Sequence, residues 1–325
     1  MFIPSPHMTW VIACLFGLLA TGTCFRVWML RGGTDAKKNQ SHLDSVRSWW
    51  ALALVLSIAM LLEKIGVIAL LAGVGTLSLW EFLRILGWKR VGKATTCVVF
   101  GLATIYYLSL LFGYAESMQV IAPVAIVLVL GAFRAWLGLV EDFIRVTAAT
   151  IWGMLLFVYC LSHAYFLLTL PGLPEPWAGN LGWILYLVLL TETNDIAQAL
   201  IGRQWGRTKI APVTSPNKSL EGLVGGIMAT TVLAVFLAPW LTSWMQNSWR
   251  SGVFLAAFSG ILIAIFGFLG DINKSGMKRD VGIKDSGTLI PGQGGMMDRV
   301  DSLTFSAPVF YYFVKAVLLM NRHVN

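Results

Sequence analysis

The chain has 325 residues, of which 57% are hydrophobic and only 12% are charged, and its mean hydropathy is +0.73. Soluble domains carry about 25% charged and about 45–50% apolar residues. The composition excludes an ordinary soluble protein, because so much apolar surface needs a bilayer around it. The net charge of +8 lies between apolar runs, so it indicates membrane topology and anionic ligands, and no nucleic-acid partner is expected.

Ten apolar segments are candidate transmembrane helices. They are 9–30, 48–63, 65–86, 95–113, 118–136, 146–170, 180–200, 220–244, 252–270 and 303–320. Only Glu63 and Lys64 separate the second segment from the third, so the sequence predicts an all-α polytopic membrane protein with nine or ten spans. No Lys or Arg precedes the first segment, which we therefore interpret as a true span and not as a signal peptide.

The positive charges predict which side of the membrane each loop faces. With the N-terminus outside, the inner loops and inner helix ends hold 20 of the 24 Lys and Arg residues. The polar loops 201–219 and 271–302 are then cytoplasmic, and the expected location is a bacterial inner membrane. We expect about five N-terminal helices over 1–145 and a C-terminal catalytic region over 146–325.

The four cysteines suggest no special chemistry. Cys14, Cys24, Cys97 and Cys160 all lie in apolar segments and form no CxxC pair. We interpret them as small buried hydrophobic residues that form neither a disulfide framework nor a zinc site.

Polar side chains mark the inner end of the span 180–200. Glu192, Asp195 and Gln198 recur every three residues and therefore share one helix face. Ionisable groups in a membrane segment cost at least about 2.5 kcal/mol each at its centre, so they persist where they face a cavity or a partner. They indicate a functional site, although contact with interfacial water would also explain them.

The following segment, 201–222, combines cations with hydroxyls. Its Lys and Arg residues, with serines at a loop-to-helix junction, suit phosphate oxygens, although an ordinary positively charged inner loop has the same composition. Gly222 and Gly226 form a GxxxG pattern, which predicts close helix packing.

The segment 271–301 contains three carboxylates that helix ends can bring together. Asp271 ends one apolar helix, while Asp298 and Asp301 lie three residues apart at the start of the next. Carboxylate oxygens suit Mg²⁺, and the cations between them suit a polyphosphate, so the segment favours phosphoryl or nucleotidyl transfer. Glycines 292, 294 and 295 let a backbone approach a ligand. A solvated loop with self-paired charges is the alternative.

These residues resemble the signature of the phosphatidate cytidylyltransferase (CDP-diacylglycerol synthase) family. The signature reads Ser, any, apolar, Lys-Arg, four residues, Lys-Asp, and later His-Gly-Gly, apolar, any, Asp-Arg, apolar, Asp. The chain fits it in register with Ser275, Lys278, Arg279, Lys284, Asp285, Gly287, Pro291, Gly294, Gly295, Asp298, Arg299 and Asp301.

A second stretch is similar to the same family. Asn194-Asp195, Gly202-Arg203 and the run from Ser215 to Gly222 follow its Asp…Gly-Arg…Ser-Pro-x-Lys-Thr-x-Glu-Gly pattern, with Ser219 in the Thr position. The two stretches span about 190–310. One departure stands out: Gln293 replaces the usual His, and glutamine cannot carry a proton near neutral pH.

The resemblance implies that CTP and phosphatidic acid give CDP-diacylglycerol and pyrophosphate, in a protein that forms a homodimer among membrane lipids. It implies that Asp271, Asp298 and Asp301 hold Mg²⁺ or another divalent cation, with a monovalent ion such as K⁺ as a second candidate. Lys284 and Arg299 join these three in catalysis. The resemblance also implies that Asp195 and Glu221 line one cavity. The residues that it implies contact the substrates are Asp195, Ser215, Lys218, Ser219, Glu221, Ser275, Lys278, Arg279, Asp285, Gln293, Gly294 and Gly295.

Three alternatives stay open on the sequence alone. Gln293 keeps open a CTP-dependent enzyme for another lipid phosphate or for a polyprenol. A transporter of an anionic solute would use the same charges along a pathway, but they cluster on one side of the membrane and no inverted repeat is visible. An inactive paralogue would not be expected to retain Asp271, Asp298 and Asp301.

Overall fold

The computed structural model describes residues 6–30, 36–246, 248–283, 286–287 and 294–324, and the described residues are mainly helical. The N-terminal helices are α1 (Pro6–Leu30), α2 (Ala36–Leu61), α3 (Glu63–Leu86), α4 (Trp88–Val91), α5 (Lys93–Leu111) and α6 (Ala115–Trp136). They are followed by α7 (Phe143–Met154), the π-helix η1 (Leu155–Cys160), α8 (His163–Phe166) and the 3₁₀ turn η2 (Leu167–Thr169). The last four are α9 (Gly182–Trp205), α10 (Leu220–Leu241), α11 (Trp249–Asp280) and α12 (Met297–Val324).

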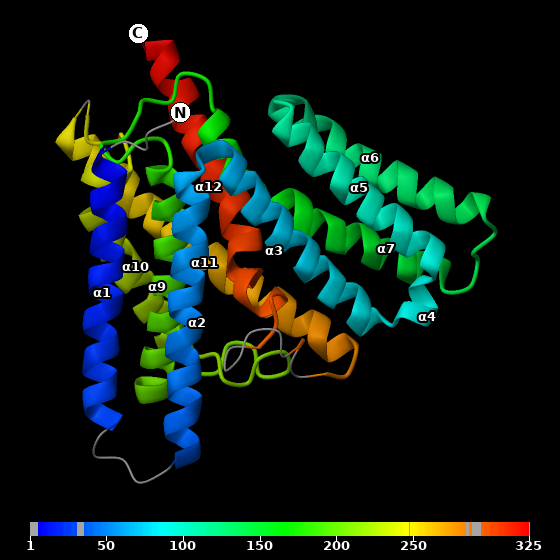
Figure 1. Cartoon of the computed structure of the whole chain (residues 1–325), viewed down its shortest axis with the longest axis horizontal. Helices are drawn as coiled ribbons and strands as arrows, with labels where there is room; N and C mark the ends of the chain where they lie inside the picture. Colours follow the sequence, from blue (N-terminus) through cyan, green and yellow to red (C-terminus); the bar gives the residue numbers. More distant parts are fainter. Residues whose placement is uncertain (1–5, 31–35, 247, 284–285, 288–293, 325) are drawn as a thin grey trace.

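All ten predicted spans fall on helices, so the all-α polytopic class is confirmed. Within the described part of the chain, eight helical segments are long and apolar enough to cross a membrane. Helices α1 and α2 add shorter apolar stretches, Thr9–Cys24 and Val46–Leu61. The count of nine or ten spans and the outside N-terminus remain predictions. In Figure 1 the start of α1 and the end of α12 lie at one end of the molecule, while the connection α9–α10, the end of α11 and the start of α12 lie toward the other.

Both polar loops are shorter than predicted, because α9 extends into the first and both α11 and α12 extend into the second. The expected loop 201–219 begins only after Trp205, where α9 ends. The expected loop 271–302 is wrong at both of its ends, since α11 runs to Asp280 and α12 starts at Met297. Gly282 terminates α11 at φ +74°: its N–H bonds the Arg279 carbonyl at 3.1 Å, and the N–H of Ile283 bonds that of Lys278 at 2.9 Å. This is a Schellman motif, and the glycine was its sequence signal.

The cysteines are free thiols, but their expected burial is wrong. Cys14, Cys24 and Cys97 are exposed and Cys160 is half-buried. The first three lie on helices with apolar surfaces, where lipid takes the place of a protein core.

Helices α9, α10, α11 and α12 pack against one another in chain order, and the GxxxG prediction is confirmed there. A Cβ atom on Gly222 would lie 2.9 Å from the Gln198 carbonyl oxygen, and one on Gly226 would lie 2.5 Å from the Gln198 side chain. Any larger residue at either position would push α10 away from α9.

A carboxylate from the N-terminal half fixes the start of α12. Glu81 on α3 is fully buried, and its Oε2 accepts a hydrogen bond of 2.8 Å from the backbone N–H of Met297. The first N–H groups of a helix have no partner within the helix, and the helix dipole favours negative charge at that end. Glu81 therefore serves α12 as a remote N-terminal cap. The division into 1–145 and 146–325 remains a prediction, and this hydrogen bond crosses it.

We predict that Glu81→Ala lowers the thermal unfolding temperature of the detergent-solubilised protein. It leaves the Met297 N–H buried without its acceptor, which costs about 1–3 kcal/mol. Glu81→Gln retains an oxygen acceptor and is expected to lose less. Exposed Glu141→Ala is the matched control. An unfolding temperature for Glu81→Ala equal to that of the control would contradict the capping role.

Candidate active site

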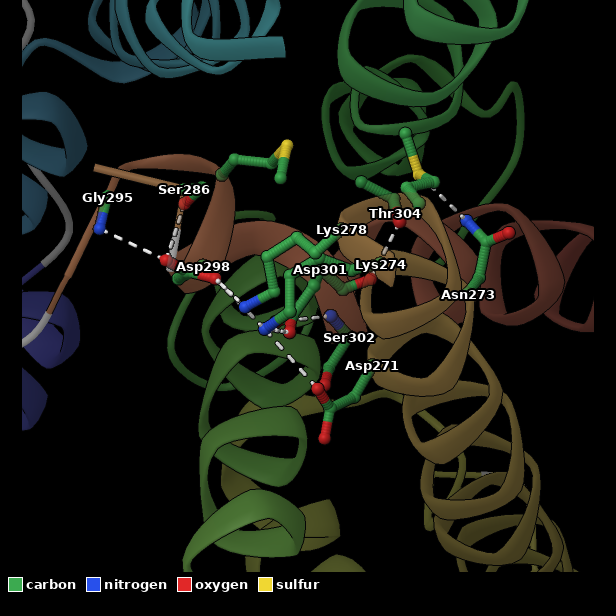
Figure 2. A network of polar contacts seen from close by, with 12 residues as sticks. Asp271, Asn273, Lys274, Lys278, Ser286, Gly295, Asp298, Asp301, Ser302 and Thr304 are labelled. Atoms are coloured by element: carbon green, nitrogen blue, oxygen red, sulfur yellow. Dashed lines mark hydrogen bonds and ion pairs between the residues drawn. The ribbon is translucent and has the colours of Figure 1, made fainter. Parts of the chain in front are cut away.

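The structure brings together the three carboxylates that the sequence places at helix ends. Asp271 lies on α11, and Asp298 and Asp301 lie in the first turns of α12. The ammonium of Lys274 lies among them: Nζ is 3.3 Å from Asp271 Oδ1 and 3.4 Å from Asp298 Oδ1, and it also bonds Asp301 Oδ2 (Figure 2). The carboxylates are thus held together by a cation from the chain itself.

Lys274 is the central residue that the sequence analysis missed. It stands among the charges of 271–301, but it lies one residue before the family signature begins at Ser275, and an expected loop gives it no helix face to share with Asp271. On a helix that continues to Asp280, Lys274 follows Asp271 by three residues and precedes Lys278 by four, which places all three on one face. The Gly282 stop signal would have revealed that face.

Two further lysines compensate the same carboxylates. Lys218 Nζ lies 2.7 Å from Asp271 Oδ2 and donates to Gln198 Oε1 at 2.9 Å. Lys278 Nζ donates to Asp298 Oδ1 at 3.0 Å. Three lysines therefore balance three aspartates.

Two residues between α11 and α12, Ser286 and Gly295, bond Asp298 directly. Asp298 Oδ2 accepts hydrogen bonds from Ser286 Oγ at 2.5 Å and from the Gly295 N–H at 3.2 Å (Figure 2). A Cβ atom on Gly295 would lie 2.6 Å from Ser286 Oγ, and Gly294 has a φ of +92° that favours glycine. The sequence predicts that these glycines approach a ligand. In the structure they lie against the side chains of Asp298 and Glu81.

A cavity of about 980 Å³ opens beside this cluster. Seven of the predicted residues line it: Asp195, Ser215, Lys218, Asp271, Asp298, Arg299 and Asp301. Glu192 and Gln198, which share the polar helix face with Asp195, also line it. Other lining residues carry no site role in the sequence analysis, among them Trp49, Ile196, Leu200, Lys209 and Lys274. Its volume lies within the range of small-molecule sites, about 300–1,000 Å³.

The acidic face of α9 is turned toward this cavity. Glu192 and Asp195 both line it, and Asp195 Oδ1 is buried with no hydrogen-bond partner among the described residues. The neighbouring Asn194 faces the protein interior, where its Nδ2 donates to the Ala264 carbonyl at 3.2 Å. The structure therefore favours the interpretation that this helix face lines a cavity over the interpretation that it only meets interfacial water.

Glu221 does not line the cavity, which corrects the expectation that it shares one with Asp195. Its carboxylate accepts the backbone N–H groups of Arg207 at 3.0 Å and Thr208 at 3.1 Å. Ser219 is buried and caps α10, with its Oγ accepting the Gly222 N–H at 3.2 Å. Both residues shape the connection 206–219 that carries Lys218 and Ser215.

The remaining predicted residues lie around the cavity or outside the described residues. Ser275 and Lys278 belong to α11 and do not line the cavity. Arg279 Nε donates to the Thr214 carbonyl at 3.4 Å and so joins the end of α11 to the connection 206–219. Lys284, Asp285 and Gln293 lie outside the described residues.

The donor set fits a hard divalent cation in its chemistry. Carboxylate oxygens are the ligands that Mg²⁺ prefers, and Asp195, whose Oδ1 is buried without a hydrogen-bond partner among the described residues, also lines the cavity. Among the described side chains, no three His, Cys, Asp or Glu are arranged to hold a metal ion as they stand. The lysines occupy the carboxylate oxygens that such an ion would take, so at least one lysine must move before it binds.

Two kinds of relative match this chain. The cytidylyltransferase family matches residues 44–317. The Uncharacterized protein YnbB of Escherichia coli strain K12 is 34% identical over 94% of this chain and 97% of its own length.

The phosphatidate cytidylyltransferases that match do so over a smaller part. Those of Synechocystis and Haemophilus influenzae are 40% and 37% identical over 45% and 44% of this chain. In both cases the matched part is 49% of the relative's own length. The family match spans most of the chain and includes the carboxylate cluster. The chain therefore belongs to the cytidylyltransferase family and is a membrane-embedded nucleotidyltransferase.

Proposed function

We propose that the protein transfers the cytidylyl group of CTP to phosphatidic acid, giving CDP-diacylglycerol and pyrophosphate at a bacterial inner membrane. The observation that carries the proposal is one cavity in which carboxylates and cations meet beside an apolar surface. The names of the phosphatidate cytidylyltransferase relatives support this choice of substrates. The homodimer that the resemblance implies remains a prediction.

The polar wall of the cavity suits the triphosphate. Arg203 and Lys209 come from the end of α9 and the connection after it, Lys218 precedes α10, and Arg299 belongs to α12. Charge-assisted hydrogen bonds from Lys and Arg to phosphate are stronger than neutral ones. Lys218 and Lys278, which bond carboxylates in this structure, would transfer to phosphate oxygens when CTP brings its own negative charge.

The apolar wall suits a lipid that arrives from the leaflet. Ile196 and Leu200 line the cavity, and they are 47% and 57% exposed on the outside of α9. Trp49 of α2 also lines the cavity. A phosphate headgroup can thus reach the cations while its acyl chains stay among the lipid-facing side chains of α9.

The reaction needs alignment and charge compensation more than proton transfer. An oxygen of the lipid phosphate, already ionised, attacks the α-phosphorus of CTP, and pyrophosphate leaves. Cations fixed around the phosphorus stabilise the developing charge, and holding both substrates in one cavity supplies proximity. A divalent cation held by Asp271, Asp298 and Asp301 would add further charge neutralisation.

Gln293 favours a second candidate within the same chemistry. It stands where the family signature has His, which favours another lipid phosphate as the acceptor of the cytidylyl group. A polyprenol carries no phosphate, so it would instead take the γ-phosphoryl group of CTP, and CDP would leave. The full-length relative YnbB carries no substrate in its name. A transporter is not supported, because the charges gather at one end of the helices and the family is one of transferases.

We predict that the purified protein forms CDP-diacylglycerol from labelled CTP, phosphatidic acid and Mg²⁺, and that EDTA abolishes the product. Asp298→Asn removes a charge that contacts two lysines, so its rate should fall by at least about a hundredfold. The exposed Lys89→Ala variant is the control and should keep full activity. If the wild type forms no product with phosphatidic acid yet does so with another lipid phosphate, the second candidate is correct. Absence of product with every acceptor would refute the proposed function.

We predict that Gln293→His adds one ionisation to the pH profile of the reaction. Histidine titrates near pH 6.5, whereas glutamine does not titrate. The ratio of the variant rate to the wild-type rate should change between pH 5.5 and pH 8, about one unit or more on either side of that value, because ionisation of the substrate phosphates affects both proteins alike and cancels in the ratio. Parallel pH profiles for the two proteins would show that position 293 does not act on the reacting phosphates.

A further inference from the structure

Lys274 differs from the other cations of the site in the number of carboxylates it contacts. Its Nζ bonds Asp271, Asp298 and Asp301, whereas Lys218 and Lys278 each form an ion pair with a single aspartate among the described residues. The three partners come from two helices, α11 and α12. Lys274 therefore joins α11 electrostatically to the start of α12.

The position of Lys274 leaves its ammonium little freedom to depart. The residue is 8% exposed, and Asp271 lies on the same helix one turn earlier. If the ammonium moved away, it would give up three ion pairs and gain none. This is strongly unfavourable, because a buried charge that loses its partners is left uncompensated. Lys218, by contrast, is carried by the connection 206–219 and can turn toward a ligand with fewer losses.

We propose that Lys274 is a resident monovalent cation: it permanently occupies the position at which a carboxylate cluster of this kind would otherwise bind a small monovalent ion. An ammonium group and K⁺ both bring one positive charge to several oxygens at once. The site then needs no exchangeable monovalent ion, and a divalent cation would enter beside Lys274, after Lys218 or Lys278 has moved to substrate. The inference rests on the proposed function for its catalytic meaning, but its first test measures only stability.

The test compares thermal unfolding of the wild type and Lys274→Ala in detergent, in KCl, NH₄Cl and N-methylglucamine chloride at equal ionic strength. The wild type should unfold at the same temperature in all three salts. Without its ammonium the carboxylate cluster repels itself, so the variant should unfold roughly 10 °C lower in N-methylglucamine. K⁺ and NH₄⁺ are small enough to fill the vacated position, and either should restore at least half of the loss.

Matched variants separate this role from a general effect of charge. Lys278→Ala also removes a lysine from the cluster, but it leaves Lys274 in place, so small cations should not restore its stability selectively. Lys274→Arg keeps the charge and should show no selective response to K⁺. A wild type that is itself stabilised by K⁺ would overturn the inference, and this measurement holds even if Lys274→Ala does not fold. A Lys274→Ala variant that responds equally to all three salts would also overturn it.

An activity measurement distinguishes failure of this inference from failure of the proposed function. If the wild type transfers cytidylyl groups equally well in K⁺ and in N-methylglucamine, while Lys274→Ala requires K⁺ or NH₄⁺, both stand. If no acceptor yields product but the stability pattern appears, the proposed function fails and the resident cation stands. If the wild-type transferase requires K⁺, the resident cation is wrong and the proposed function stands.

Discussion

Three aspartates gathered between α11 and the start of α12 need positive charge close by, and the surrounding structure supplies it. Transfer of ions out of water costs several kcal/mol each, and only well-formed pairs recover that cost. Lys218, Lys274 and Lys278 provide the pairs, from a loop and from two successive turns of one helix. Because the charges balance within the protein, an incoming polyphosphate with its own cation can exchange partners without leaving any charge unpaired.

The close approach of the helices makes this arrangement possible. Gly270 on α11 faces the Asp301 backbone, where a side chain would collide with α12, and Gly267 lies against Asn194 of α9. Small residues of this kind let helices meet in a membrane without a large apolar side chain between them. Glu81 reaches in from α3 to hold the first turn of α12, so the N-terminal helices contribute to the geometry of the site as well as to membrane anchoring.

Sequence patterns predicted the fold class and many of the residues that form the site. They predicted the geometry of the site less well. Apolar runs located ten helices, and the spacing of Asp298 and Asp301 placed both on one face. The same patterns placed Glu221 and Ser219 near the ligand. Glu221 instead bonds the Arg207 N–H, which only the folded connection brings close, and Ser219 caps its own helix at Gly222. Lys274 was missed because hydropathy ended α11 at Asp271. Charged residues continue a helix freely where it leaves the bilayer, and a glycine stop marks its end more reliably than the loss of hydrophobicity.

The central claim is that CTP binds in the cavity between α9, α11 and α12, and photoaffinity labelling tests it most directly. Azido-CTP would be irradiated with the purified protein, and the modified peptides would be identified by mass spectrometry. The account predicts labelling in the stretches 203–218 and 271–301, suppressed by excess CTP. Specific labelling confined to the opposite end of the helices, around Lys64 and Glu116 at the smaller cavity there, would contradict it.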